Sequence, residues 1–234
     1  STGNATDFGD LIVKRQPPAC FSNATRGCCA GGYIIASTTP LYSSNTGVNI
    51  IDFITMTSAG NALDFGDMTV AYRNRDSCQS PTRGILAGGY NSPGDDTNVI
   101  EFVVTATTGN ATDFGDMTVA TRGPAGASSN TRGLMAGDAS YNGNSIEFIT
   151  IATTGNAKRF GDLTVKRAEV AAGGTSNNVR ALFGGGADQP SSPYYSNHID
   201  FVRIATEGNA IDFGDLSIVR SCAAAVSNAH GGLS

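Results

Sequence analysis

One eight-residue phrase occurs five times along this chain, and it constrains the fold more than any other feature. The first copy, at residues 3–10, reads Gly-Asn-Ala-Thr-Asp-Phe-Gly-Asp, and the later copies begin at residues 60, 109, 155 and 208. The resulting units are 46 to 57 residues long. Periods of this length fit propeller blades better than short solenoid coils. The sequence therefore predicts a fold built from repeated structural units.

Each unit contains four short segments with the pattern of β-strands. The repeated phrase is followed by an apolar alternation, by a stretch of small residues, and by an Arg-Gly pair that opens an apolar run ending in glycine, as at residues 83–89. The last segment alternates strictly, as in Ile-Glu-Phe-Ile-Thr-Ile at 146–151, which is the pattern of a half-buried strand. No helical periodicity is present. These features predict an all-β fold with four strands per unit.

The order of these segments resembles the kelch repeat. In kelch repeats an apolar strand ends in Gly-Gly, and an aromatic strand later leads to a Leu and an Arg before the next blade. The matching residues here are Ala87, Gly88, Gly89, Phe102, Phe114, Met117 and Arg122, with Phe in place of the usual kelch Trp. The resemblance implies a kelch-like β-propeller of about five blades, each of four short antiparallel strands, with residues 1–234 forming a single domain.

The two ends of the chain fall inside one blade of this scheme. Residues 3–10 correspond to the last strand of a blade, and residues 229–233 correspond to the second strand. Joining them would close the ring and remove two exposed sheet edges. One strand of that fifth blade is missing, so either the blade has three strands or the chain is a segment of a longer protein.

The last Asp of the phrase recurs in every unit. A ring of carboxylates is a candidate set of metal ligands, but a residue present once per blade usually serves the blade, since a specific site normally breaks the symmetry. We therefore expect each Asp to bind its own turn or a neighbouring Arg, and the phrase Phe to pack between blades. These residues are Asp10, Asp67, Asp116, Asp162 and Asp215, with Phe8, Phe65, Phe114, Phe160 and Phe213.

An arginine opens the Arg-Gly segment in four units. Pairing of this arginine with the recurrent Asp is the simpler interpretation, and binding of an anionic ligand in a central channel is the alternative. The residues are Arg26, Arg83, Arg132 and Arg180.

The five cysteines form no Cys-x-x-Cys pair, so their spacing indicates neither a disulfide framework nor a zinc site. Cys20, Cys78 and Cys222 lie in the small-residue stretch, and Cys28 and Cys29 stand where other units have larger apolar residues. We interpret all five as small buried apolar side chains.

No catalytic constellation is present in the sequence. His198 and His230 have no partner at the spacing of a triad or a metal site, and no P-loop, Gly-x-Ser-x-Gly or His-Glu-x-x-His motif occurs. A metal enzyme of the kelch-type oxidase class is disfavoured because its metal ligands usually include His, and this chain has only two histidines. The sequence predicts no catalytic residue, no metal, no cofactor and no enzymatic activity.

The net charge of −5 argues against binding to nucleic acid or to an anionic membrane surface, because both need a basic face. No apolar run is long enough to span a membrane. These observations leave proteins, glycans or other subunits as the partners to consider.

The loop after the Gly-Gly strand varies from unit to unit and is rich in Tyr, Ser, Asn and Gly, the composition of a recognition surface. It covers residues 34–49, 91–98, 138–144 and 187–197. In a propeller these loops gather on one face, so we expect a binding surface there. Its predicted residues are Tyr42, Tyr90, Asp95, Asp96, Tyr141, Tyr194 and Tyr195.

The amino-acid sequence of the repeated phrase resembles repeats in structural and tail-fibre-like proteins of bacteriophages. That resemblance implies a structural and recognition module of a virion appendage, tail fibre or decoration protein, which contacts other virion or fibre subunits and a host surface glycan or protein. Oligomerisation fits this role. The alternative is a secreted carbohydrate-binding propeller lectin, so the expected location is the virion or the extracellular space.

Overall fold

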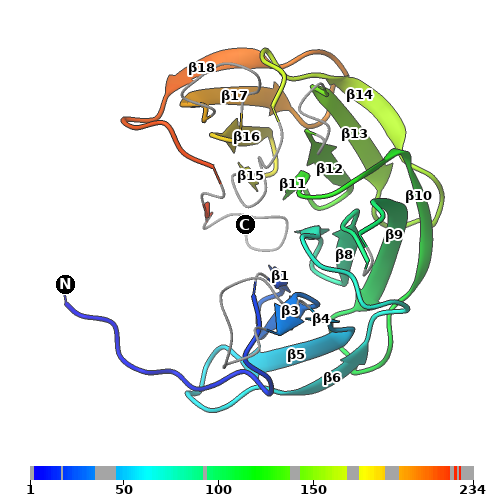
Figure 1. Cartoon of the computed structure of the whole chain (residues 1–234), viewed down its shortest axis with the longest axis vertical. Coiled ribbons are helices and arrows are strands. Elements are labelled where there is room, and N and C mark those ends of the chain that lie inside the picture. Colours follow the sequence, from blue (N-terminus) through cyan, green and yellow to red (C-terminus); the bar gives the residue numbers. More distant parts are fainter. Residues whose placement is uncertain are drawn as a thin grey trace.

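The computed structural model describes residues 3–16, 18–34, 46–91, 94–137, 143–167, 174–187, 195–221, 224–225 and 227. These residues form four antiparallel sheets of four strands each, together with one short two-stranded ladder. Figure 1 shows the four sheets arranged as an arc, with one strand of each sheet near the centre and one at the rim. The prediction of an all-β fold with four-stranded units is confirmed.

Each sheet corresponds to one repeat unit, which we call blades 1 to 4 in chain order. Blade 1 contains β1 (Ala19–Ser22), β2 (Arg26–Ala30), β5 (Ile50–Thr55) and β6 (Leu63–Asp67); blade 2 contains β7 (Asp76–Gln79), β8 (Arg83–Ala87), β9 (Thr97–Val104) and β10 (Thr112–Thr121). Blade 3 contains β11 (Ala125–Ser128), β12 (Arg132–Ala136), β13 (Ser145–Thr150) and β14 (Lys158–Asp162); blade 4 contains β15 (Gly174–Ser176), β16 (Arg180–Gly184), β17 (His198–Arg203) and β18 (Ile211–Asp215).

The repeated phrase forms the outer strand of every blade. Within each outer strand the Phe-Gly step interrupts the register with the neighbouring strand, as between Asp113 and Gly115 in β10. Such a bulge inserts one extra residue and bends the strand. Gly115 adopts a φ of 144°, and a Cβ there would overlap the backbone of Gly155 in the next blade. The glycine therefore permits a close contact between the rims of neighbouring blades.

This rim contact is a clamp made of three hydrogen bonds. Between blades 1 and 2, the Gly109 N–H donates to the Phe65 carbonyl (2.7 Å) and the Ala111 N–H donates to the Asp67 carbonyl (2.8 Å). The Asn110 side-chain Oδ1 accepts from the Asp67 N–H (3.1 Å). The same three bonds join Asn61 and its neighbours to residues 8–10, Asn156 and its neighbours to β10, and Asn209 and its neighbours to β14. The Gly-Asn-Ala part of the phrase is thus the recognition element between blades.

The phrase phenylalanines pack between blades, as predicted, at the junctions that have a complete blade on both sides. Phe65, Phe114 and Phe160 are only 2%, 2% and 4% exposed, and each ring meets another Phe of its own blade edge to face. The prediction is wrong for Phe8 and Phe213, which are 39% and 54% exposed. In the described part of the chain, Phe8 has no complete blade of its own and Phe213 has no following blade.

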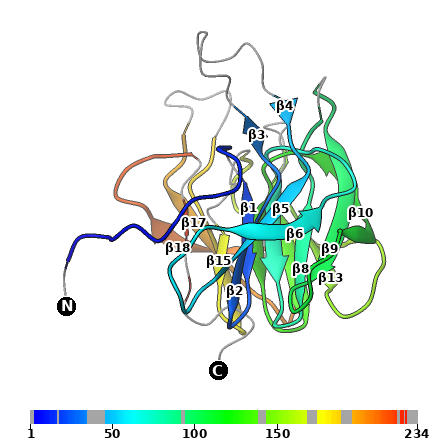
Figure 2. The same ribbon diagram turned by 90° about the horizontal axis from the view of Figure 1, so that it is seen from below.

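The predicted fifth blade is not assembled in the described residues. Residues 3–10 lie outside every assigned strand and are exposed along their whole length, and they run away from the arc in Figures 1 and 2. Most of residues 222–234 lie outside the described residues. The described structure therefore consists of four blades preceded by one copy of the rim phrase.

The recurrent arginines do not pair with the phrase aspartates in the described structure, which corrects that prediction. Arg83 instead stacks on Phe102, with Cζ 4.5 Å from the ring centroid, and donates to the Ile151 carbonyl of the next blade (2.8 Å). Stacking of a guanidinium on an aromatic ring is favourable and leaves the N–H groups free to donate. Arg26 and Arg132 make equivalent contacts to blades 2 and 4, and Arg180 stacks on Phe201.

The first prediction concerns the rim clamp. Replacing Asn110 with Ala removes the acceptor for the Asp67 N–H and should lower the free energy of unfolding by about 1 kcal/mol. Asn4 occupies the same position in the first phrase, but its side chain has no hydrogen-bond partner among the described residues. Asn4→Ala should therefore change the free energy of unfolding by only a few tenths of a kcal/mol. Urea unfolding of the two variants measures the difference, and equal effects would show that the clamp contributes nothing.

A second prediction concerns the face between blades 1 and 2. A Cβ on Gly84 would overlap the ring of Phe21, which is buried and cannot move aside. Gly84→Ala should therefore destabilise the protein by roughly 1–3 kcal/mol through overpacking. Gly27 is the equivalent residue of blade 1, where a Cβ comes no closer than 3.3 Å to Ile54, so Gly27→Ala is the matched control. Thermal unfolding compares them, and a stable Gly84→Ala protein would contradict the packing seen here.

Candidate binding surface

The loops that follow the second strand leave the sheet through a Gly-Gly pair in blades 1, 2 and 4. Gly88 and Gly89 have φ values of 62° and 105°, a region that strongly favours glycine. The turn brings Tyr90 back against Arg73 of the preceding linker, where the two residues exchange N–H to carbonyl hydrogen bonds of 3.0 and 2.9 Å. In blade 1 the same turn brings Tyr33 against Gln16. The ladder of β3 (Tyr33–Ile34) and β4 (Thr46–Gly47) continues outward from there, at one end of the molecule in Figure 2.

Two tyrosines and two arginines alternate in space at this end of the propeller blades. The Cζ atom of Arg73 lies 4.2 Å from the ring centroid of Tyr90 and 5.7 Å from that of Tyr33. The Cζ atom of Arg122 lies 5.0 Å from the Tyr90 ring. We call Tyr33, Arg73, Tyr90 and Arg122 the Tyr–Arg stack. It joins the loops of blades 1 and 2 to the linkers that enter blades 2 and 3.

Two carboxylates border the Tyr–Arg stack. Asp96 pairs with Tyr90 through a β-bridge, and its Oδ1 lies 3.6 Å from Nε of Arg122. The Asp95 side chain is exposed, while its backbone N–H donates to Asn91 Oδ1 (3.1 Å). The Arg122 side chain remains 42% exposed. The surface therefore offers guanidinium donors and carboxylate acceptors side by side.

The structure brings three of the predicted binding residues together: Tyr90, Asp95 and Asp96. Tyr195 is 50% exposed and belongs to the loop of blade 4, where it forms a β-bridge with Ala187. Tyr42, Tyr141 and Tyr194 lie outside the described residues. Sequence reasoning did not select Arg73 and Arg122, although both are the basic residue that recurs after the repeated phrase.

Other arginines of the linkers pair with buried carboxylates in blades 1, 2 and 4. The third strand of each blade carries one such acid: Asp52, Glu101, Glu147 and Asp200. Arg15 pairs with Asp52 (2.9 Å), Arg167 pairs with Asp200 (2.6 Å), and Arg75 pairs with Glu101. Burial lowers the pKa of Arg75, whereas Glu101 raises it.

Blade 3 lacks such an arginine among the described residues. Glu147 instead accepts hydrogen bonds from the backbone N–H (2.9 Å) and the hydroxyl of Thr118. Arg122 lies in the linker that enters blade 3, and Glu147 does not need it for a buried ion pair. In blade 2 the buried pair is made by Arg75, and Arg73 belongs to the stack.

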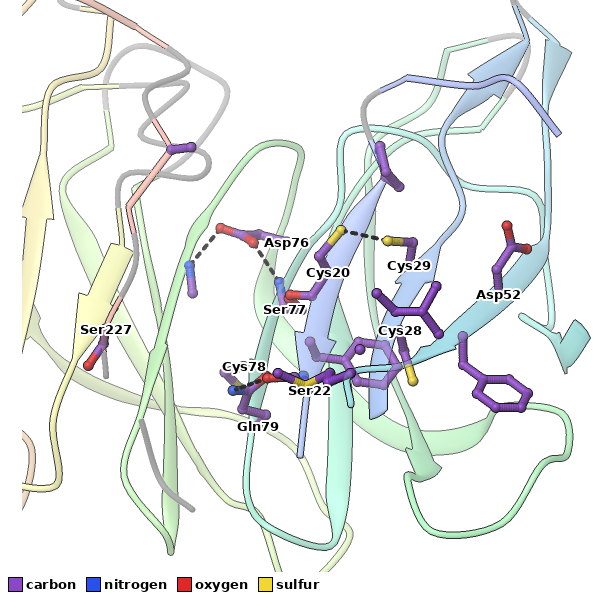
Figure 3. Close-up of a pocket in the computed structure, with 18 of the residues that line it drawn as sticks. Cys20, Ser22, Cys28, Cys29, Asp52, Asp76, Ser77, Cys78, Gln79 and Ser227 are labelled. Carbon is purple, nitrogen blue, oxygen red and sulfur yellow. Dashed lines mark hydrogen bonds between the residues drawn. The ribbon is translucent and has the colours of Figure 1, made fainter. Parts of the chain in front are cut away.

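A cavity of about 730 Å³ lies where the inner strands β1, β7, β11 and β15 approach one another (Figure 3). Its polar groups mainly join neighbouring inner strands. The Ser77 hydroxyl donates to the Cys20 carbonyl (2.6 Å), and Asp76 accepts from the Gly126 N–H (2.8 Å). No Arg or Lys is among the described residues that line the cavity, which argues against the predicted alternative of an arginine-lined channel. No group of three possible metal ligands occurs in the described part of the chain.

The cysteines differ in exposure more than the sequence interpretation allowed. Cys28 and Cys78 are buried, as predicted, and burial raises the pKa of Cys28 to about 12. Cys20 is exposed and Cys29 is partly exposed, so the prediction is wrong for this pair. Their Sγ atoms lie 3.1 Å apart. Cys222 lies outside the described residues.

No protein-family model and no curated protein matches the chain. Among solved structures the chain is similar to YjhT, a kelch-repeat β-propeller protein, with a TM-score of 0.68 and 13% sequence identity over 88% of this chain and 72% of that one. The fold is a kelch-type β-propeller. At this identity the likeness establishes the fold alone. No helix among the described residues is long and apolar enough to cross a membrane.

The third prediction concerns the buried ion pairs of this propeller. Asp200→Asn leaves the fully buried Arg167 guanidinium without its anion and should cost about 3–5 kcal/mol. Glu147→Gln removes a buried charge that faces no arginine within the described residues, and a neutral amide oxygen still accepts from Thr118, so about 1 kcal/mol is expected. Chemical unfolding of both variants provides the comparison. A larger loss for Glu147→Gln would contradict this assignment of the pairs.

Proposed function

We propose that the chain is a non-enzymatic recognition module of a phage virion appendage, such as a tail fibre or decoration protein, and that it contacts its ligand through the Tyr–Arg stack. The observation that carries the proposal is the break in repeat symmetry at the stack. Residues that serve the fold recur in each blade, as the rim Asn and Phe do. Among the described residues, the alternation of Tyr and Arg is instead found in the loops of blades 1 and 2 and the two linkers beside them.

The chemistry of this surface suits a carbohydrate of the host surface. Tyr side chains provide rigid amphipathic anchors at low entropic cost. Exposed Arg122 donors beside the Asp95 and Asp96 carboxylates supply both donors and acceptors, which match the hydroxyl groups of a sugar. A protein ligand would use the same anchors, so the ligand class must be tested directly.

Exposed apolar faces at the two ends of the arc support assembly with other subunits. Phe213 on blade 4 is 54% exposed, and Met56 on blade 1 is 49% exposed, whereas Ile151 and Ile204 at the position of Met56 are each 1% exposed. Large exposed apolar residues at a face that is buried elsewhere in the same repeat favour contact with a further unit or subunit. The virion setting itself rests on the similarity of the repeated phrase to phage structural repeats.

A secreted propeller lectin is the second candidate, and the Tyr–Arg stack favours it equally. The two proposals differ in location. Antibody detection of the chain in purified virions, at constant stoichiometry to the capsid protein, supports the appendage. Recovery of the chain only as free protein in the medium, together with glycan binding, would favour the lectin and reject the appendage.

The fourth prediction concerns the stack. Arg122→Ala and Tyr90→Ala should each lower apparent affinity for host cells and for glycan-array ligands by at least about tenfold, in line with hot-spot losses at binding surfaces. Arg159→Ala is the control, because Arg159 is an exposed arginine on β14, where it pairs with Asp162 of the same outer strand. Circular dichroism checks that all three variants are folded. Unchanged binding by both stack variants would remove this surface from the proposal.

A further inference from the structure

Two cysteines face one another on the inner strands of blade 1. Cys20 of β1 and Cys29 of β2 are direct partners in the antiparallel register. Directly opposed residues of antiparallel strands have Cα atoms roughly 4.5–5.5 Å apart, within the range that disulfides span. Their Sγ atoms are 3.1 Å apart and point toward each other in Figure 3. A bond between them needs rotation of the two side chains and no shift of a strand.

The pair has no counterpart in the other blades. The same two positions hold Ser77 and Leu86 in blade 2, Gly126 and Met135 in blade 3, and Gly174 and Phe183 in blade 4. There a small residue opposes a large apolar residue, and the large residue belongs to the core shared with the preceding blade. In blade 1 both positions carry thiols and line the cavity instead. Packing therefore does not account for the second cysteine.

The surroundings divide the two thiols into an attacking and a resolving partner. The hydrogen bond between the two thiols lowers the pKa of Cys29, the Arg15 guanidinium lowers it further, and burial and Asp52 oppose these effects. The same hydrogen bond and the neighbouring Asp76 raise the pKa of Cys20. Arg15 is held at this strand by a hydrogen bond to the Cys29 carbonyl (3.0 Å). Cys29 is thus the better thiolate, and Cys20 retains its proton.

We propose that Cys20 and Cys29 form a peroxide-reactive dithiol that closes to a disulfide across β1 and β2. In the first step the Cys29 thiolate attacks one oxygen of hydrogen peroxide; an S–O bond forms, the O–O bond breaks, and the released hydroxide takes a proton from solvent to give water. In the second step the Cys20 sulfur attacks the sulfenic sulfur; the S–S bond forms, and the hydroxyl leaves as water with the Cys20 proton. Two thiols are oxidised, and one peroxide is reduced to two waters.

The bond would fix the innermost strand of blade 1. β1 pairs with β2 on one side and contacts β7 through the hydrogen bond from the Ser77 hydroxyl to the Cys20 carbonyl. A disulfide restricts the unfolded chain and so stabilises the folded state. The oxidised protein should therefore unfold at a higher temperature than the reduced protein, by about 5 °C.

Peptide mapping tests the proposal, because trypsin cleaves after Arg26 and separates the two cysteines. The full chain is reduced, desalted, treated with a small excess of hydrogen peroxide, denatured in an alkylating agent and digested at mildly acidic pH. We expect peptides 16–26 and 27–73 to be joined with the loss of two hydrogen atoms. Fragmentation of peptide 27–73 between Cys28 and Cys29 assigns the bond without any variant.

Variants sharpen the result. Cys20→Ser and Cys29→Ser should each abolish the joined peptides and the rise in unfolding temperature, while Cys78→Ser, at a buried cysteine, should retain both. In Cys20→Ser the Cys29 sulfenic acid has no resolving thiol and should be trapped by dimedone. Two results would overturn the proposal. One is a disulfide between Cys20 and any other cysteine, and the other is alkylation of both thiols after peroxide treatment of the native protein.

Discussion

The rim clamp is the interaction on which the rest of this structure depends. It places the Asn of one phrase against the backbone of the preceding phrase, as Asn110 does at Asp67, and it repeats at four junctions. The close approach is possible because the preceding strand has glycine at the contact, where a Cβ would overlap the next backbone. Between two complete blades the phrase Phe is then buried, as Phe65, Phe114 and Phe160 are.

The fold could be predicted from the sequence because the residues that form the clamp all stand within one short phrase. Glycine, asparagine and phenylalanine stand at fixed offsets within eight residues, so their recurrence marked each blade directly. The contacts of Arg83 could not be predicted in the same way. Its guanidinium meets Phe102 on a neighbouring strand and a carbonyl of the next blade, and both contacts depend on register and blade spacing rather than on sequence separation. A search for opposite charges therefore selected the wrong partner.

The buried carboxylates were missed for a related reason. Glu147 lies in a strictly alternating segment, which is the pattern of a strand with one face toward solvent. In the propeller the side of these strands that carries Glu147 and Asp200 is covered by the linker that follows the preceding blade, so both acids are buried without any change in the local pattern. Burial then makes a hydrogen-bonded or ionic partner obligatory. The linkers provide that partner, which ties the polar residues of the linkers to the packing of the blades.

The position of the linker arginine decides whether it serves the core or the surface. Arg15 and Arg167 follow the phrase Asp by five residues and form buried ion pairs, whereas Arg73 and Arg122 follow it by six and join the Tyr–Arg stack. One added residue thus goes with the change from the buried acid to the surface loops, and in blade 2 the chain turns at Asn74 (φ 51°) and provides a further arginine, Arg75, for the buried pair. This spacing was present in the sequence as a signal for the surface site. The sequence does not reveal its meaning, because the buried acids that bind the arginines at the five-residue spacing are brought near them only by the fold.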